Sequence, residues 1–311
     1  MKGIRIVSTG KALPKRIVSN DDLKEIIDTS DEWITTRTGI KTRRYCKEET
    51  NTSLAIEAAT KAIEKGNIDM NQIGAILVAT TTADLAFPTT ACRVQKALGM
   101  DEEVMSFDLN AGCTGFLLGL NVARGLLQTQ RKKYVLLIGS EQLSRIVNFE
   151  DRGTCILFGD GAGAAILEAS DGAYFQRSWT RGNEDVLSCP GIGNGINKLQ
   201  MKGSEVFKFA VTVLEQSLRT VMEDAGVTID DVDYVLCHQA NARIIGHVQK
   251  KFKGYEDKFM MNIQKYGNTS AASIPILMDE MRDEGKLQPG SKVLLAGFGA
   301  GLSWSSAYIE I

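Results

Sequence analysis

The chain has 311 residues, with 36 Lys and Arg against 38 Asp and Glu, and 43% of its residues are hydrophobic. This composition is typical of a globular protein of one large or two medium α/β units, and the near-zero net charge argues against a dedicated nucleic-acid binder. The opening stretch Met1–Val7 lacks the long apolar run of a signal peptide or membrane span. We therefore predict a cytoplasmic protein with no membrane segment, and a first strand at Met1–Val7.

Short apolar runs alternate with segments of helical period along the whole chain, which indicates strands covered by helices on both faces. Two pairs of these runs resemble each other at nearly the same separation, close to half the chain: 73–78 with 232–237, and 134–137 with 292–295. Helices are predicted before both runs of the first pair, at Ser53–Glu64 and Val206–Asp224. The repeat indicates two similar α/β halves that meet near Ala169–Gly172.

Cys113 is the candidate nucleophile. It follows the predicted strand Val104–Leu109 and precedes the buried apolar helix Phe116–Leu127, so we place it in the first turn of that helix. Backbone N–H groups at a helix start favour a thiolate. The alternative is a small buried hydrophobic side chain, which is how we interpret the other five cysteines, at positions 46, 92, 155, 189 and 237. These six form no C-x-x-C pair and no cluster with zinc spacing, so we expect free thiols and no metal.

His238 and Asn268 are the candidate partners of the cysteine. His238 ends the predicted strand Tyr234–Cys237, a position where sheet proteins bind ligands, whereas His247 is expected on the polar surface of the next helix. Asn268 opens a later helix, and the half-chain offset brings its loop opposite Cys113. A helix N-cap is the alternative role for this asparagine.

A glycine run at Gly159–Gly163 leads into the apolar strand Ala164–Leu167 rather than into a helix. A dinucleotide-binding loop would open a helix. We therefore interpret the run as a turn that permits close packing.

Five motifs resemble, in the same order, the signatures of the β-ketoacyl-acyl-carrier-protein synthase III family: Asn110–Phe116, Asp151–Ala164, His238–Ile244, Tyr266–Ser273 and Gly297–Gly301. The resemblance implies an α/β, thiolase-like fold with five layers, αβαβα. Residues 1–170 would form the half that carries the nucleophile, and residues 171–311 the half that carries the histidine and asparagine. Cys113 lies in Gly-Cys-Thr instead of Ala-Cys-Ser, a departure that bears at most on substrate preference.

The resemblance also implies the reaction, a decarboxylative Claisen condensation that initiates fatty acid biosynthesis. An acyl-CoA such as acetyl-CoA would acylate Cys113, and malonyl-acyl-carrier protein would then lose carbon dioxide and attack the thioester. His238 and Asn268 would stabilise the enolate, and backbone N–H groups of Cys113 and of the final glycine loop, Gly299, Ala300 and Gly301, would bind the oxyanion. Coenzyme A enters as a substrate thioester, and no metal or redox cofactor is needed.

Further positions resemble binding residues of the family. The set expected to bind CoA and substrate is Trp33, Arg37, Arg152, Gly203, Asn241 and Phe87. Phe87 would also cross a homodimer interface to close the partner's acyl pocket. The set expected to bind the acidic carrier protein is Gln239, Ala240, Asn241, Ala242, Arg243, Lys208, Lys250 and Lys251, of which Arg243, Lys250 and Lys251 would form, with His247, the basic side of one helix.

Four other interpretations were weighed. A papain-like protease shares the order Cys, His, Asn, but Cys113 lacks that family's flanking residues. A degradative thiolase would need a second catalytic cysteine, and no cysteine follows Cys237. A non-enzymatic binding module would be indifferent to loss of Cys113. A related acyltransferase or starter-loading ketosynthase of a specialised pathway stays open, because it would share all three site residues.

Overall fold

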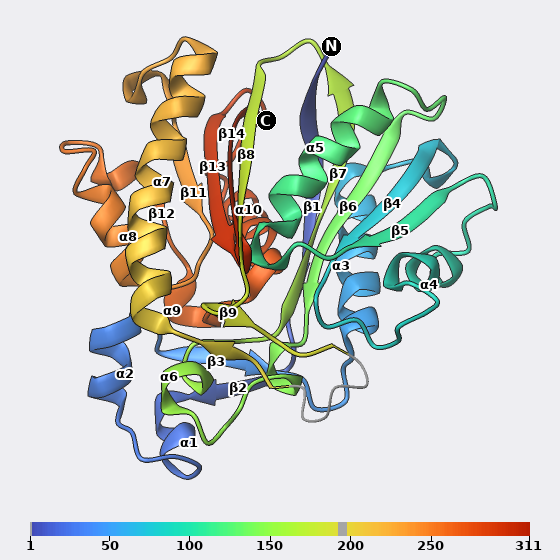
Figure 1. Cartoon of the computed structure of the whole chain (residues 1–311). Coiled ribbons are helices and arrows are strands. Elements are labelled where there is room, and N and C mark those ends of the chain that lie inside the picture. The colour runs from blue at the N-terminus through green and yellow to red at the C-terminus, as the bar shows by residue number, and fades with distance from the viewer. Residues whose placement is uncertain (1, 192–197) are drawn as a thin grey trace.

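The computed structural model describes residues 2–191 and 198–311, and within them ten strands form two five-stranded sheets (Figure 1). The first sheet has the order β1-β7-β6-β4-β5, with bounds Gly3–Ala12, Gly161–Ser170, Tyr134–Glu141, Ile73–Ala79 and Met105–Leu109. The second has the order β12-β11-β13-β14-β8, with bounds Phe259–Met260, Tyr234–Cys237, Lys292–Gly299, Gly301–Glu310 and Tyr174–Asn183. The predicted first strand is β1, and Met1 lies outside the described residues.

The two sheets match strand for strand. In the first, β4 runs parallel to β5 and β6, while β7 runs antiparallel to β6 and β1. In the second, β11 runs parallel to β12 and β13, while β14 runs antiparallel to β13 and β8. The two similar pairs of runs in the sequence are β4 with β11 and β6 with β13, so each pair occupies equivalent places. The division of the chain at residues 170 and 171 stays a prediction.

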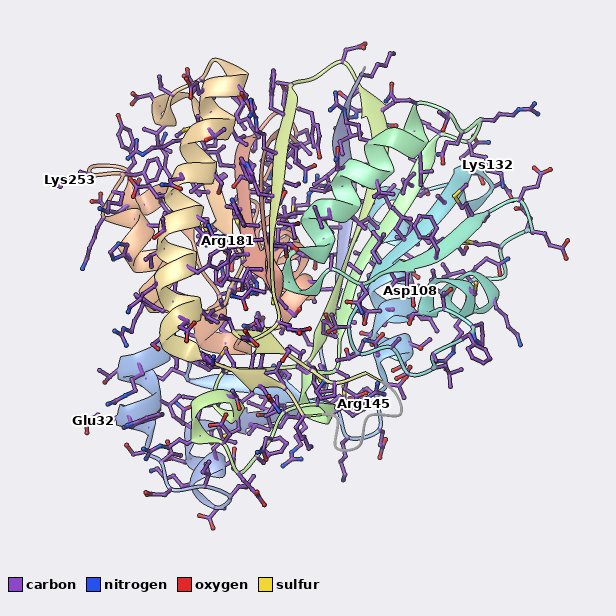
Figure 2. All side chains as sticks on the ribbon, in the orientation of Figure 1. Glu32, Asp108, Lys132, Arg145, Arg181 and Lys253 are labelled. Carbon is purple, nitrogen blue, oxygen red and sulfur yellow. The ribbon has the colours of Figure 1, made fainter. Side chains whose placement is uncertain are left out.

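Six helices complete the five layers, αβαβα, that the family resemblance implied. They are α3 (Asn51–Gly66) and α4 (Thr90–Ala97) outside the first sheet, α5 (Gly115–Leu127) and α10 (Ser273–Asp283) between the sheets, and α7 (Gly203–Ala225) and α8 (Ala242–Gln249) outside the second. Separate clusters of buried apolar side chains join the layers. Figure 2 shows that side chains fill the spaces between the ribbons.

The helix α5 is apolar nearly all round because it lies between two sheets. Its residues Phe116, Leu117 and Leu120 are buried, and a Cβ added to Gly119 would meet Leu137 of β6 at 2.5 Å. The second half of the helix is less covered, since Asn121 and Gly125 are exposed. The interpretation of 116–127 as a buried helix is therefore confirmed for the face that packs between the sheets.

The glycine run before β7 is only partly a turn. The strand begins at Gly161, so the last three residues of Gly159–Gly163 belong to the sheet. A Cβ on Gly163 would lie 2.7 Å from the backbone nitrogen of Ile276 in α10. The expected close packing is real, and it is the packing of the central helix α10 directly on β7.

Short elements gather at one end of both sheets, around α6 and β3 in Figure 1. They are β2 (Arg16–Ser19), α1 (Asn20–Lys24), α2 (Asp31–Thr38), β3 (Thr42–Tyr45), α6 (Arg152–Cys155), β9 (Leu187–Ser188), β10 (Gln200–Met201) and α9 (Ile263–Tyr266). No helix in the described part of the chain is both long enough and apolar enough to span a membrane.

The cysteines correct one expectation. All six are free, and Cys155 and Cys237 are buried as predicted. Cys92 and Cys189, in contrast, are exposed. Cys92 lies in α4, whose buried residues are Thr90, Ala91 and Val94, so its side chain falls on the solvent face of that helix.

Candidate active site

Cys113 lies in a tight turn between the two sheets. After β5 the chain forms a single 3-10 turn, Gly112–Thr114, and α5 begins only at Gly115. Cys113 therefore precedes the helix rather than occupying its first turn. Gly112 has a φ of 55°, a conformation that favours glycine. The Thr114 hydroxyl lies 2.8 Å from the hydroxyl of Ser303, which fixes this turn to β14 of the opposite sheet.

Gly299, the last residue of β13, packs directly against the cysteine. A Cβ built on Gly299 would lie 2.8 Å from the backbone nitrogen and 3.2 Å from the Cβ of Cys113. A Cβ built on Gly112 would lie 3.5 Å from the backbone nitrogen of Ala300. The absence of a side chain at 299 thus lets the hairpin of β13 and β14 approach the nucleophile. Ala300 forms that hairpin's turn and Gly301 begins β14, and neither lines the pocket described next.

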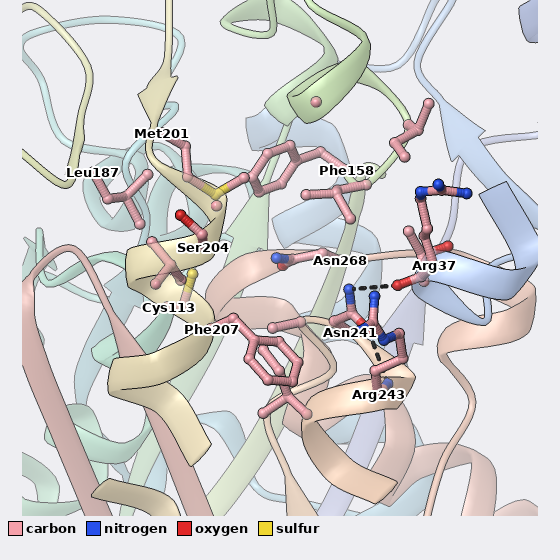
Figure 3. Close-up of a pocket in the computed structure, with 18 of the residues that line it drawn as sticks. Arg37, Cys113, Phe158, Leu187, Met201, Ser204, Phe207, Asn241, Arg243 and Asn268 are labelled. Carbon is pink, nitrogen blue, oxygen red and sulfur yellow. Dashed lines mark hydrogen bonds between the residues drawn. The ribbon is translucent and has the colours of Figure 1, made fainter. Parts of the chain in front are cut away.

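A pocket of about 460 Å³ connects Cys113 with residues that are distant in the sequence. Cys113 and Asn268 both border it, as do Phe158, Ser204 and Phe207 (Figure 3). The sequence-predicted residues that line the pocket are Trp33, Arg37, Cys113, Gly203, Lys208, His238, Ala240, Asn241, Arg243, Asn268 and Gly299. Residues from both halves of the chain therefore meet at one cavity.

His238 presents a single ring nitrogen to this pocket. Its Nδ1 lies 2.7 Å from the hydroxyl of Ser273, and its Nε2 is buried with no partner among residues 2–191 and 198–311. The same hydroxyl accepts the backbone N–H of Gln239 at 3.3 Å, and in the described residues no other acceptor faces its hydrogen. The hydroxyl must then donate to Nδ1, which leaves the ring hydrogen on Nε2. Burial lowers the pKa of His238 to about 3, so the ring is neutral.

Asn268 is held so that its amide nitrogen is available. Its backbone pairs with residues 157–159, with its N–H donating to Leu157 at 2.8 Å and its carbonyl accepting from Gly159 at 2.9 Å. Its side-chain oxygen accepts the N–H of Ser270 at 2.9 Å. This bond closes a local turn and is not the N-cap considered from sequence, because Thr269 and Ala272 occupy the N-cap positions of the two helices that follow. With the oxygen held in this way, the amide nitrogen of Asn268 stays available to the pocket.

The Cys113 thiol is not pre-ionised by its surroundings. Burial, the largest effect, raises the pKa of Cys113 to about 12, and the nearby charge of Glu141 acts in the same direction. Hydrogen bonds from Ser270 and from the backbone of Cys113 itself oppose the shift without cancelling it. The loss of water around the sulfur therefore opposes the thiolate that the position near a helix start favours.

Trp33 and Arg37 line the pocket, and Arg152, which is not one of the lining residues, lies over the Trp33 ring. The guanidinium groups of Arg37 and Arg152 each lie 4.4 Å from the ring centre of Trp33, so the predicted shared face of Trp33 and Arg37 is confirmed. Asn241 donates to the carbonyl of Arg37 at 3.1 Å and caps α8 through Arg243. This contact joins α2 to α8 across the entrance.

Several predicted surface residues lie elsewhere. Gln239 is 1% exposed and donates to the carbonyl of Cys237 at 2.7 Å, so it has no free surface. Lys250 and Lys251 were predicted on the basic side of the helix, but α8 ends at Gln249 and both lysines are exposed beyond it. His247 is exposed on α8 as expected. Phe87 is 85% exposed and does not line the pocket.

Sequence reasoning missed the apolar residues of the cavity. They are Ile156, Leu157, Phe158, Leu187, Met201, Val206, Phe207, Ile244 and Phe298. Each stands in an ordinary apolar pattern that also predicts a core position, so no signal in the sequence separates pocket lining from packing.

Comparison with known proteins agrees with this geometry. Residues 107–180 match the family described as 3-oxoacyl-[acyl-carrier-protein] synthase III, and residues 222–311 match the C-terminal region of the same enzymes. A β-ketoacyl-[acyl-carrier-protein] synthase III from Clostridium acetobutylicum is 44% identical over 100% of this chain and 99% of its own length. The crystal structure of the 3-oxoacyl-[acyl-carrier-protein] synthase III from Aquifex aeolicus superposes with a TM-score of 0.94 at 43% identity, covering 99% of this chain and 100% of that one.

A second similar solved structure comes from a polyketide pathway. It is the priming β-ketosynthase from the R1128 polyketide biosynthetic pathway, with a TM-score of 0.92 at 30% identity, covering 100% of this chain and 96% of that one.

The duplicated sheets and a cysteine facing a histidine and an asparagine across their junction define a condensing enzyme of the thiolase fold. The similarity over the whole length then sets the family. This chain belongs to the β-ketoacyl-acyl-carrier-protein synthase III family, the acyltransferases that initiate fatty acid biosynthesis.

Proposed function

We propose that this chain joins a primer acyl group from acyl-CoA to malonyl-acyl-carrier protein, with Cys113 as the carrier of the acyl group. The supporting observation is that Cys113, the Nε2 of His238 and the amide of Asn268 meet in one pocket. In the first half-reaction the Cys113 sulfur attacks the acyl thioester and CoA leaves as a free thiol. In the second, malonyl-acyl-carrier protein loses carbon dioxide and its carbanion attacks the acyl-cysteine.

His238 and Asn268 suit the second half-reaction because both present neutral N–H donors. Loss of carbon dioxide leaves negative charge on the thioester oxygen, and donors fixed before the reaction stabilise that charge most where water is excluded. The unpartnered Nε2–H of His238 and the free amide nitrogen of Asn268 would supply two such bonds. The backbone N–H of Cys113 and that of Gly299, at the start of the predicted glycine loop, would serve the oxyanion of acyl transfer.

The entrance suits a CoA thioester. We assign the nucleotide to Trp33, Arg37 and Arg152, since an indole offers a stacking surface and two guanidinium groups offer phosphate contacts. Gly203 and Asn241 line the same entrance. The acidic carrier protein would meet the exposed bases around it, Lys208, Arg243, Lys250 and Lys251. Buried Gln239 would act there only by shaping the backbone.

Three further assignments belong to the same proposal. The exposed ring of Phe87 would be covered in a homodimer and would close the acyl pocket of the second copy. The reaction uses side chains and thioesters alone, without a metal or redox cofactor. The enzyme would act in the cytoplasm.

The alternative function is starter loading or acyl transfer in a specialised pathway, which the similarity to the R1128 priming β-ketosynthase supports. That enzyme is 30% identical to this chain, whereas the Clostridium and Aquifex fatty acid enzymes are 43–44% identical. The higher identity favours primary fatty acid synthesis.

Intact-protein mass spectrometry tests the proposal directly. The protein is mixed with acetyl-, isobutyryl- or a longer acyl-CoA, and malonyl-acyl-carrier protein is added afterwards. We expect a mass increase of one acyl group that Cys113→Ala abolishes and the matched Cys92→Ala retains, followed by discharge into a β-ketoacyl product. Acylation without carbon-carbon bond formation would favour the alternative, and a Cys113 that is never acylated would overturn the proposal.

A further inference from the structure

Glu141 is a buried carboxylate that lies one hydroxyl group away from the reactive sulfur. It ends β6, is fully buried, and accepts the hydroxyl of Ser270 at 3.1 Å. The turn that carries Ser270 packs against the turn that carries Cys113, and the Ser270 hydroxyl influences the pKa of the Cys113 thiol. Ser270 has a φ of 50°, a left-handed conformation that is costly for serine and is typically kept where function requires it. Ser270 thus stands between the two groups, beside the turn of Cys113 and hydrogen-bonded to Glu141.

The other neighbours of Glu141 all donate hydrogen bonds to it. The Thr82 hydroxyl lies 2.5 Å and the Thr81 N–H 3.2 Å from its Oε2. The amide nitrogen of Asn51 donates to the hydroxyl oxygens of Thr80 and Thr82, at 3.0 and 3.2 Å, so the hydrogens of these hydroxyls are directed away from Asn51. This surrounding suits an ionised carboxylate, which only accepts. Burial nevertheless raises the pKa of Glu141 to about 7, so the carboxylate is a competent base near neutral pH.

The acylation step needs a proton acceptor that the residues facing the pocket do not supply. Cys113 must lose the proton of its thiol as the sulfur attacks, because the thiolate is the nucleophilic form. His238 cannot take it, since its Nε2 carries the ring hydrogen and its Nδ1 is occupied by Ser273. Asn268 is not a base. The Ser270 hydroxyl leads from the turn of Cys113 to Glu141, a buried group that can accept a proton.

We propose that Glu141, acting through the hydroxyl of Ser270, accepts the proton of Cys113 during acyl transfer. The thiol passes its proton to the Ser270 oxygen while Ser270 passes its own proton to Oε1 of Glu141. The sulfur then bonds to the thioester carbon, and the bond from that carbon to the leaving sulfur breaks. The departing thiolate takes the proton back from Glu141 through the Ser270 hydroxyl, which returns Glu141 to its ionised form. A thiol and a thioester give a thiol and a thioester, so no electron or co-reactant is consumed. Only the identity of the acyl donor rests on the function proposed above.

Alkylation of Cys113 by iodoacetamide tests this without any acyl donor, so its result is independent of the proposed condensation. The rate is followed by peptide mass spectrometry at a series of pH values, with exposed Cys92 as the internal reference. In the unmodified protein the Cys113 rate should rise with pH and level off above about 7, where Glu141 is ionised. A rate that keeps rising in proportion to hydroxide up to pH about 9 would overturn the proposal.

The two possible roles of Glu141 predict opposite effects of Glu141→Gln on the rate of Cys113 alkylation. If Glu141 accepts the proton, its loss should slow Cys113 alkylation at pH about 8 by roughly tenfold or more and remove the plateau. If Glu141 acts only as a negative charge that raises the pKa of Cys113, the same substitution should speed alkylation. A faster rate therefore refutes the relay.

The matched control is Glu168→Gln. Glu168 is a second buried glutamate, lies on β7 and pairs with Lys133. In this variant the pH dependence of Cys113 alkylation should be unchanged. The other titratable or charged groups on elements around Glu141 are Cys113 itself, Asp84 with its partners Arg93 and Arg145, and Asp160 with Cys46. Asp84→Asn, whose site is separate from Ser270, should leave the plateau near pH 7.

If Glu141→Gln fails to fold, two other measurements decide the question. They are the pH profile of the unmodified protein and the alkylation rate of Ser270→Ala, which should also be slower.

Discussion

The Nδ1 of His238 lies 2.7 Å from the hydroxyl oxygen of Ser273, although the two residues are 35 positions apart in the chain. His238 follows β11 in the second sheet, and Ser273 opens α10 in the layer between the sheets. This bond decides which ring nitrogen carries the hydrogen, and so decides whether the pocket receives a donor or an acceptor.

Ser273→Ala should therefore weaken condensation more than acylation. Without the serine hydroxyl, the ring hydrogen can move to Nδ1, and the donor toward the enolate is lost. We expect the rate of malonyl-dependent product formation to fall by about 10-fold to 100-fold, while Cys113 acylation by acyl-CoA stays within about twofold. Single-turnover mass spectrometry measures both steps on one sample. Ser178→Ala, on β8 away from the pocket, is the control, and an equal loss in both steps of the Ser273 variant would contradict the tautomer argument.

Gly299→Ala should damage both stability and acylation. The new Cβ would stand 2.8 Å from the backbone nitrogen of Cys113, a contact that backbone cannot relieve by a rotamer change. Such overpacking costs about 1–3 kcal/mol in the free energy of unfolding. Urea unfolding and the acylation rate would both be measured. Gly182→Ala, where no heavy atom lies within 4 Å of the new Cβ, should change neither.

The buried imidazole makes stability fall at acidic pH. Burial lowers the pKa of His238 from 6.5 to about 3, so between these values the unfolded chain binds the proton and the folded protein does not. The free energy of unfolding should then decrease by up to about 1.4 kcal/mol for each pH unit lost in this window. His238→Gln should remove that component of the pH dependence, and His247→Gln, on exposed α8, should keep it. Urea unfolding at a series of pH values gives the comparison, and parallel curves for the two variants would refute the assignment.

Trp33→Ala should affect CoA thioesters selectively. Removing the indole takes away the surface between two guanidinium groups, so the KM for acetyl-CoA should rise by about tenfold with little change in kcat. An acyl-N-acetylcysteamine thioester, which has no nucleotide, should react equally with both proteins. Trp179→Ala is the control, because Trp179 stacks on Trp304 and not on the arginines beside Trp33. Equal effects on both donors would contradict the nucleotide assignment at Trp33.

Much of the frame was predictable from the sequence, because it depends on local pattern. The runs at 73–78 and 232–237 are strands at equivalent places of two sheets, and the apolar stretch 116–127 is the helix between them. The convergence of Cys113, His238 and Asn268 followed from the motif order and the repeat.

The properties that escaped prediction depend on tertiary burial. The pKa of the Cys113 thiol is raised mainly by burial. That burial comes from elements distant in the sequence, so the local pattern around the turn does not show it. Glu141 looks like an ordinary polar strand end until the loop at 268–273 is placed beside it. The exposure of Cys92 depends on which face of α4 meets a neighbouring element. The sequence pattern also did not show that α8 ends before Lys250.

The loop 268–273 contributes the Asn268 amide, the Ser270 hydroxyl and the Ser273 hydroxyl within six consecutive residues, and each contacts or faces a different partner. Part of the apolar lining comes instead from Leu187 and Met201, on the small β9–β10 ribbon that belongs to neither large sheet. The reacting groups and part of the pocket wall thus come from separate stretches of chain. Substitutions in the ribbon can change the shape of that wall while the reacting groups keep their geometry.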